Sequence, residues 1–469
     1  MYEEQGSFFE EDYNSHVERF EEMLKNNESY FFDVDVFEYL AEHYLEDGNI
    51  QLALKALEIG IIQHPSSAII IIRKAQLHAS TGRIRSGHEL LNHAELLDPK
   101  NDEIHLTRAS LYSQEHKHEE AVQSYLMAID LCEGEGIDDL YLDLAFEYEN
   151  LEKYDLAIQT LEKALAVNPD NEGSLYEMGY CYEQSDRIPD CINFCIDFLN
   201  DHPYSFTAWY IMGNAYFQLE KFEQAITAYD FCTVIKESFS SAHFNRANSH
   251  VQLEQYDLAI EYYEKTLEHE SPQGITHMYM AECFEKLDED EKALLHYNKA
   301  IAMDEELADA WMGKAIVKDK MGMTSESIRF LKKAIELEEK NPEYWHILGE
   351  AYEKQSKFSE AKECYEMVVW LEPENIDAWL DLCNIITELE SPAEAIPIIK
   401  KALELNADSE ELMYRLVAFL LELGNTTGAK NELEKALNTN YEAHKKLFNY
   451  YPEAKNINAV LALIDSFRP

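Results

Sequence analysis

The chain has 469 residues, with 39 lysines and arginines against 91 aspartates and glutamates, so its formal net charge is −52. This charge repels nucleic acid and anionic membrane surfaces, and it excludes both as expected partners. Hydrophobic residues make up 46% of the sequence, which excludes a disordered acidic chain and allows a long continuous core.

Residues 1–33 are predicted to form an acidic tail followed by a capping helix near residues 13–25, whose apolar face covers the next segment. The acidic start has neither the basic segment nor the apolar segment of an export signal. The longest aliphatic run, residues 68–72, is too short to span a membrane. We therefore expect a cytoplasmic protein whose cysteines are reduced.

Residues 34–443 carry a small residue at one position every 34 residues, with a single step of 36. The series is Ala53, Gly87, Ala121, Ala157, Cys191, Ala225, Ala259, Ala293, Ser327, Ala361, Ala395 and Ala429. A small residue at this period allows the same close helix crossing in every copy, so it predicts twelve helix–turn–helix units. The step of 36 falls near residues 133–136, where we expect a flexible joint.

Other positions of the repeat are equally regular, and two repeats show the full pattern of Trp, Gly, Tyr, Ala and Tyr. They are residues 206–239, with Trp209, Gly213, Tyr216, Ala225 and Tyr229, and residues 342–375, with Trp345, Gly349, Tyr352, Ala361, Tyr365 and Pro373. This pattern resembles the tetratricopeptide repeat (TPR) family. The resemblance implies an all-α fold, a right-handed α-solenoid of about twelve 34-residue helix–turn–helix repeats with helical caps. It also implies a non-catalytic scaffold that binds an extended peptide or a helix of a partner protein in its concave groove.

In such a solenoid the first helix of each repeat lines the groove. Carrying these positions onto the sequence gives a peptide-binding strip of Tyr176, Tyr180, Tyr210, Asn214, Phe217, Phe244 and Asn248. Asn214 and Asn248 lie 34 residues apart, so we expect their amides to stack in register and to bind the main chain of an extended peptide. The alternative is that these side chains only pack against one another.

Lys286, Lys320 and Lys354 recur at one groove position and could hold an acidic ligand. The alternative is local ion pairing with neighbours such as Glu282 and Asp319, which at a surface contributes only about 0–1 kcal/mol. The acidic surface elsewhere favours a basic peptide or helix as the partner.

No catalytic constellation is recognised. Cys181, Cys191 and Cys195 cluster in one repeat, but two of them fall at packing positions, so buried structural thiols are favoured over a metal or redox site. Phosphate-binding loops and nucleophile motifs are not found. The sequence therefore predicts neither enzymatic activity nor a metal or cofactor.

Residues 444–469 leave the period and are predicted to form a helical cap broken at Pro452. This segment is apolar on most sides, which indicates either a helix tucked over the last repeat or a homodimer surface made of Val460, Leu461, Ile464 and Phe467. A self-assembling structural protein and a regulatory subunit of an enzyme complex are therefore alternatives to the scaffold. A further alternative places Phe8 and Phe9 in the groove near Ile69 and Ile72 as an internal plug.

Overall fold

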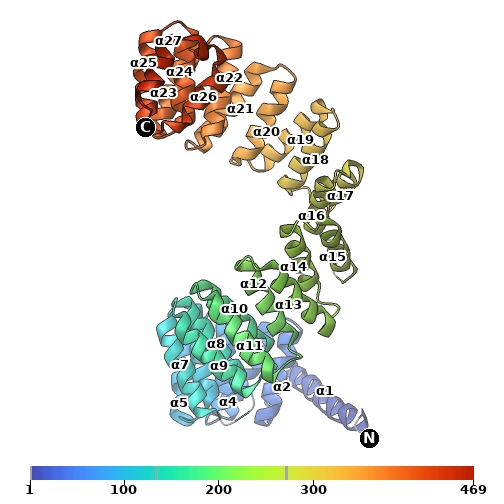
Figure 1. The fold of residues 1–469 in the computed structure, drawn as a ribbon. Helices are drawn as coiled ribbons and strands as arrows, with labels where there is room; N and C mark the ends of the chain where they lie inside the picture. Colours follow the sequence, from blue (N-terminus) through green and yellow to red (C-terminus); the bar gives the residue numbers. More distant parts are fainter. Residues whose placement is uncertain (1–2, 133, 135, 270–272, 469) are drawn as a thin grey trace. The chain divides into compact units, whose positions relative to one another are not determined.

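The computed structural model describes residues 3–132, 134, 136–269 and 273–468, with side chains from residue 15 onward. These residues form two compact units, an N-terminal unit of residues 1–237 and a C-terminal unit of residues 238–469. Each unit is an all-α solenoid in which successive helices lie side by side (Figure 1). The predicted fold class is confirmed.

The N-terminal unit contains thirteen helices in its described part. They are α1 (Glu3–Asn26), α2 (Val34–Glu46), α3 (Ile50–Gln63), α4 (Ala68–Ser80), α5 (Ile84–Leu97), α6 (Asp102–Gln114), α7 (His118–Leu131), α8 (Ile137–Asn150), α9 (Tyr154–Val167), α10 (Glu172–Gln184), α11 (Ile188–Asp201), α12 (Phe206–Gln218) and α13 (Phe222–Ile235).

The C-terminal unit continues the same alternation. Its helices are α14 (Ser240–Gln252), α15 (Tyr256–His269), α16 (Gly274–Lys286), α17 (Asp290–Met303), α18 (Ala308–Lys320), α19 (Thr324–Leu337), α20 (Pro342–Lys354), α21 (Phe358–Leu371), α22 (Ile376–Leu389), α23 (Pro392–Leu405), α24 (Glu410–Glu422) and α25 (Thr426–Thr439). The chain ends with η1 (Glu442–His444), α26 (Lys445–Tyr450), η2 (Pro452–Asn456) and α27 (Asn458–Ser466).

The helices pair because a small residue lets each second helix approach its neighbours closely. Ala53, Ala157, Ala225 and Ala361 of the predicted series are fully buried. The turn inside most pairs is made by one residue with positive φ, a conformation that glycine adopts without strain and other residues adopt rarely. Glycine fills this position at Gly48, Gly82, Gly322 and Gly424, but the other turns use His116, Glu152, Asp186, Glu220, Glu254, Asp288 and Ser356. The turn position therefore recurs with the repeat, although its residue does not.

Glycines of the first helices make room for tyrosine rings of the second helices. A Cβ on Gly313 would lie 2.3 Å from Cζ of Tyr297, and a Cβ on Gly213 would lie 2.5 Å from Cε1 of Tyr229. The rings of both tyrosines are almost fully buried, and each points its hydroxyl toward the first helix of its own repeat. The small residue thus determines where these phenol groups lie.

The chain ends differ from the predictions in detail. Helix α1 begins at Glu3 and is longer than the predicted helix near residues 13–25. At the predicted joint, Glu133 and Glu135 lie outside the described residues, while α8 begins directly after Gly136 and packs on α7. The sequence is divided into the two compact units between Glu237 and Ser238, well after this predicted joint.

The C-terminal helix α27 lies over the last repeat. Val460 is 2% exposed and Ile464 is 5% exposed, and both belong to the hydrophobic core that also contains Leu433 and Leu437. The prediction that Val460 and Ile464 form a homodimer surface is therefore wrong, because their side chains are already buried within the chain. Leu461 and Phe467 are half-buried.

Candidate peptide-binding groove

The first helices α10 and α12 form a pocket in the N-terminal unit together with the start of α11. Its volume is 170 Å³, and it is lined by Tyr176, Gly179, Tyr180, Glu183, Ile188, Cys191, Ile211, Asn214, Ala215 and Gln218. Three predicted site residues, Tyr176, Tyr180 and Asn214, therefore line one hollow. The 44% exposure of Tyr180 leaves its ring accessible to a ligand.

The remaining predicted residues of this unit lie beside the pocket. The Tyr210 ring centre is 6.3 Å from that of Tyr176 and 6.0 Å from that of Tyr229, so the three rings form one aromatic group. Phe217 packs edge-on against Phe222 at the start of α13, with ring centres 5.4 Å apart. Phe217 therefore supports the turn between α12 and α13, and it does not line the pocket.

Each predicted asparagine accepts a hydrogen bond from a tyrosine of its own repeat. The Tyr229 hydroxyl donates to Oδ1 of Asn214 at 2.7 Å, and the Tyr263 hydroxyl donates to Oδ1 of Asn248 at 2.5 Å. These bonds fix the orientation of both amides, with the oxygen directed toward the tyrosine. This pairing was not predicted, although Asn and Tyr recur 15 residues apart in both repeats. Stacking of the two amides on each other stays a prediction.

In the C-terminal unit, Phe244 of α14 lies in an aromatic group with Tyr263 and Tyr279. Phe244 lies edge-on to both tyrosines, with ring centres 5.6 and 5.7 Å away, while the two tyrosine rings are nearly parallel. Phe244 and Asn248 are half-buried. The structure thus brings Phe244 and Asn248 together through Tyr263, the hydrogen-bond donor to the amide.

Carboxylates without a basic partner lie on the first helices α8 and α10. Burial raises the pKa of Asp143 to about 6 and that of Glu149 to about 7, and it also raises the pKa of Glu177. The Cys181 thiol donates to Oε1 of Glu149 at 3.3 Å. Within the described residues, no lysine or arginine forms an ion pair with these three carboxylates. A cation brought by a ligand would lower these raised pKa values, because it stabilises the ionised form of each carboxyl.

The C-terminal unit repeats this feature on α16. Burial, with Asp309 nearby, raises the pKa of Glu282 to about 7, and burial also raises the pKa of Glu285. The Tyr297 hydroxyl donates to Oε2 of Glu285 at 3.0 Å. From its repeat position, Glu282 was predicted only as an ion-pair neighbour of the lysines, because that position does not reveal its burial.

Two of the three predicted ladder lysines are engaged in ion pairs. Lys320 Nζ lies 2.6 Å from Oδ1 of Asp288 and 2.9 Å from Oδ1 of Asp290, and Lys354 Nζ lies 2.5 Å from Oδ2 of Asp319. Lys286 is exposed. The pairs of Lys320 and Lys354 join neighbouring repeats, which favours a structural role for these two lysines.

The clustered cysteines are buried thiols. Cys181, Cys191 and Cys195 are at most 2% exposed. Burial raises the pKa of Cys181, and a hydrogen bond with Cys191 together with burial raises the pKa of Cys195. Among the residues that the structure describes, no group of three or more His, Cys, Asp or Glu side chains could hold a metal ion.

None of the described helices is both long and apolar enough to cross a membrane. Ile72 is fully buried, and the side chains of Phe8 and Phe9 lie outside the described residues, so the internal plug stays a prediction.

Comparison with known families accounts for this repeat architecture. Tetratricopeptide repeat profiles match residues 240–271, 308–341, 342–375 and 387–447, and the profile of the anaphase-promoting complex, cyclosome, subunit 3 family matches residues 150–232. The chain belongs to the tetratricopeptide repeat family. Tetratricopeptide repeats are in general non-catalytic modules for protein interaction.

Two curated proteins show the extent of the sequence similarity. The mitochondrial import receptor subunit TOM70 of Rattus norvegicus is 31% identical over 88 residues, which is 18% of this chain and 14% of the relative. A TPR repeat-containing protein of Methanocaldococcus jannaschii is 32% identical over 89 residues, 19% of this chain and 15% of the relative. The matched segment thus spans about one seventh of the length of these curated relatives.

Solved structures are similar at lower identity. A chain of the Cut9–Hcn1 hetero-tetramer of the APC/C is 14% identical, with 92% of this chain and 95% of that chain covered and a TM-score of 0.40. YrrB, described as a TPR protein with an unusual peptide-binding site, is 18% identical, with 39% of this chain and 95% of that chain covered and a TM-score of 0.34.

Proposed function

We propose that this tetratricopeptide repeat protein is a non-catalytic scaffold that binds an extended peptide or a helix of a basic partner protein along its first helices. The observation that carries the proposal is the set of half-buried carboxylates on these helices that form no ion pair with a lysine or arginine among the described residues. Glu149 and Glu177 lie in the N-terminal unit, and Glu282 lies in the C-terminal unit. A buried carboxylate gains most from a charged hydrogen bond when a lysine or arginine reaches it.

Aromatic rings and amides next to these carboxylates supply the other contacts that a peptide requires. Tyr176 and Tyr180 line a pocket that could receive an apolar side chain, and the Asn214 amide lies at its edge. Asn248, held by Tyr263, offers its amide N–H groups to a main-chain carbonyl. The match to an anaphase-promoting complex subunit profile and the similarity to an import receptor subunit also support a protein partner.

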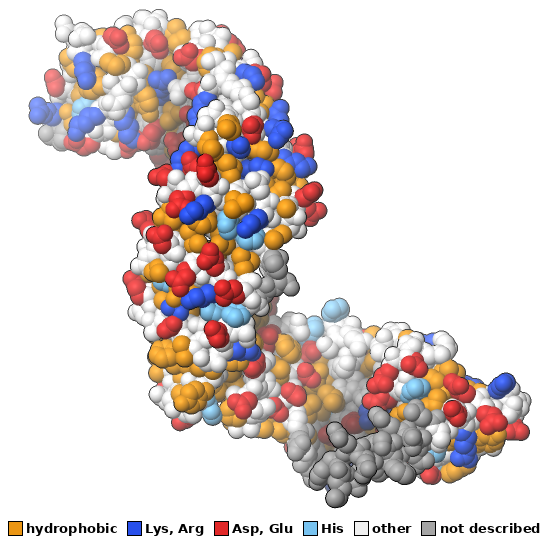
Figure 2. Space-filling model, turned by 90° about the vertical axis from the view of Figure 1, so that its right-hand side faces the viewer, with side chains coloured by type: hydrophobic (Ala, Val, Ile, Leu, Met, Phe, Trp, Pro, Cys, Tyr) orange, Lys and Arg blue, Asp and Glu red, His pale blue; other side chains and the backbone are white. Residues whose placement is uncertain are grey.

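Acidic side chains outside the groove would assist encounter with a basic partner. On the face drawn in Figure 2, aspartates and glutamates are spread among basic and apolar side chains rather than gathered into one patch. A net charge of −52 raises the encounter rate with a cationic protein at low salt. The groove residues would then determine which cationic segment stays bound.

The test is selection of a random-peptide library on the immobilised full-length protein. The double variant Asn214→Ala/Asn248→Ala should lose the enriched peptides, and Glu149→Gln/Glu177→Gln should lose those that carry lysine or arginine. The alanine variant also removes two internal hydrogen bonds, so it should lower the free energy of unfolding by about 1 kcal/mol per bond.

A matched control separates binding from stability. The variant Tyr229→Phe/Tyr263→Phe removes the same two hydrogen bonds and keeps both amides. It should be destabilised to a similar extent and should still bind the selected peptides. Equal retention of the peptides by the wild type and by the asparagine variant would contradict the proposed site.

Self-assembly through the C-terminal helix is not favoured as the function, because Val460 and Ile464 are buried in the chain's own core. A regulatory subunit of an enzyme complex would use the same groove, and the selected peptides would identify such an enzyme through their sequence.

A further inference from the structure

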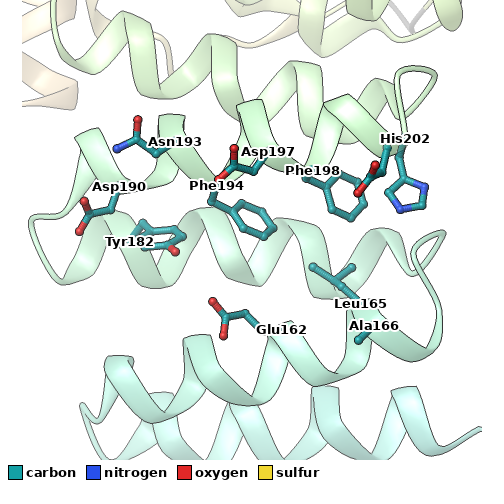
Figure 3. Close-up of a pocket in the computed structure, with 11 residues that line it drawn as sticks. Glu162, Leu165, Ala166, Tyr182, Asp190, Asn193, Phe194, Asp197, Phe198 and His202 are labelled. Carbon is teal, nitrogen blue, oxygen red and sulfur yellow. The ribbon is translucent and has the colours of Figure 1, made fainter.

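A second pocket lies between the second helices α9 and α11, away from the groove residues described above. Its volume is 510 Å³, and it is lined by Glu162, Leu165, Ala166, Tyr182, Asp190, Asn193, Phe194, Asp197, Phe198, Asp201 and His202. Figure 3 shows Phe194 and Phe198 side by side along α11, with Glu162 on one side of the rings and Asp197 on the other. The pocket therefore combines an aromatic floor with acidic walls.

The aromatic floor is a continuous row of four rings. Successive ring centres from Tyr182 through Phe194 and Phe198 to His202 are 6.1, 5.8 and 4.7 Å apart. Phe194, Phe198 and His202 are half-buried, so part of each ring reaches solvent. A row of partly exposed rings of this length can bind a flat or cationic group.

Phe198 is larger and more exposed than the residue at the same position of every other repeat. The corresponding residues of the other eleven repeats are small or medium-sized and buried: Gly60, Ala94, Ala128, Ala164, Cys232, Thr266, Ala300, Ala334, Val368, Ala402 and Ala436. Those side chains fill the seam between helices, and alanine is sufficient for that purpose. The Phe198 ring instead extends into the pocket, so the scaffold alone does not explain it.

Of the four acidic side chains that line the pocket, only Asp190 is paired with a basic residue among those that the structure describes. Glu162, Asp197 and Asp201 are exposed, and within the described residues none of them forms an ion pair with lysine or arginine. None of the lining residues is a lysine or arginine. The pocket is therefore electrostatically complementary to a cation.

At the Tyr182 end of the row of rings, a basic side chain of the protein itself already binds a ring and a carboxylate together. The Arg187 guanidinium lies 5.5 Å from the Tyr182 ring centre, and its Nε donates to Oδ2 of Asp190 at 2.8 Å. A guanidinium here uses a ring and a carboxylate together. Phe194 with Asp197, and Phe198 with Asp201, repeat that combination of ring and carboxylate further along α11.

We propose that the pocket between α9 and α11 is a second docking site, which binds an arginine-bearing segment of a partner protein with its guanidinium groups over Phe194 and Phe198. Arginine fits better than lysine, because its planar group stacks on a ring and donates to a carboxylate at the same time. This site is independent of the groove on the first helices, and a partner could occupy both.

The test is fluorescence anisotropy of the full-length protein with a fluorescein-labelled peptide that carries arginines along one helical face. Glu162→Gln/Asp197→Asn/Asp201→Asn should weaken binding by about tenfold or more. Phe198→Leu keeps an apolar side chain but removes the ring, and it should weaken binding by about threefold. Replacing each arginine of the peptide with neutral citrulline should abolish binding.

The matched control neutralises three exposed acids on α7, in the variant Glu119→Gln/Glu120→Gln/Asp130→Asn. Its net charge equals that of the pocket variant, and its affinity for the peptide should stay within about twofold of the wild type. Equal losses in the two triple variants would overturn the proposal, because binding would then follow total charge. Unchanged affinity in both the pocket variant and Phe198→Leu would also overturn it. Thermal unfolding monitored by circular dichroism should show that all variants are folded.

Discussion

At the scale of single residues, side chains of the second helices organise those of the first. Tyr229 and Tyr263 orient Asn214 and Asn248, whereas Tyr297 at the corresponding position donates to Glu285. One buried phenol thus supports an amide in one repeat and a carboxylate in another. The periodic tyrosine therefore preserves a hydrogen-bond donor, while the acceptor varies and gives each repeat its own groove chemistry.

The burial of Glu282 makes stability depend on pH. Its pKa of about 7 in the folded state lies above the ordinary value of 4.5, so the folded state binds a proton more tightly than the unfolded state. The free energy of unfolding should therefore fall as the pH rises from about 4.5 to about 7. Glu282→Gln removes this loss and should raise the free energy of unfolding at pH 8 by about 1–2 kcal/mol.

Urea unfolding of both proteins, with the same measurement near pH 4.5, checks this prediction, because the stabilisation should largely disappear at the lower pH. Glu264→Gln on the exposed side of α15 is the control and should change stability little at either pH. A Glu282→Gln protein less stable than the wild type at pH 8 would show that the carboxylate has a stabilising partner.

At the scale of helices, the 34-residue period predicted the architecture because the close helix crossings depend directly on small residues. Ala157 and Ala225 lie in such crossings, and both are fully buried. The pocket containing Tyr176 and Asn214 could also be anticipated, since groove positions follow from the repeat. The partners of Asn214 and the burial of Glu282 could not, because they depend on side-chain conformations and on neighbouring helices. The orientation of α27 could not either, since an apolar helix outside the repeat has no periodic position to define its buried face.

The buried face of α27 leads to a prediction about the C-terminal cap. Val460→Ala/Ile464→Ala removes apolar groups that pack near Leu433 and Leu437, and it should lower the stability of the cap by about 2–4 kcal/mol. Hydrogen exchange across α24–α27 should become faster, while the molar mass from light scattering should not change.

The control for this prediction is Leu461→Ala/Phe467→Ala, which alters the two half-buried members of the same helix. Its effect on hydrogen exchange should be smaller, because folding buries less apolar surface area at these two positions. A fall in molar mass for Val460→Ala/Ile464→Ala without faster exchange would instead support the dimer.

At the scale of the whole molecule, the excess of acidic residues causes an electrostatic repulsion that the local ion pairs cannot cancel. With 91 acidic residues against 39 basic residues, pairing every lysine and arginine once would still leave 52 acidic side chains unpaired. Many of the pairs are exposed, as those of Lys320 and Arg187 are, and such pairs contribute little. The folded chain therefore carries strong self-repulsion, which a basic partner would relieve on binding.

This self-repulsion predicts that sodium chloride stabilises the isolated protein. Raising the ionic strength from about 0.01 M to about 0.15 M shortens the screening length from about 30 Å to about 8 Å, so repulsion between distant carboxylates weakens more than attraction within adjacent ion pairs. The Tm measured by calorimetry should rise over this range and then level off. Potassium chloride at equal ionic strength should give the same curve, because screening depends on charge rather than on ion identity. A Tm that falls with salt would mean that the ion pairs between repeats, such as those of Lys320 and Lys354, outweigh the repulsion.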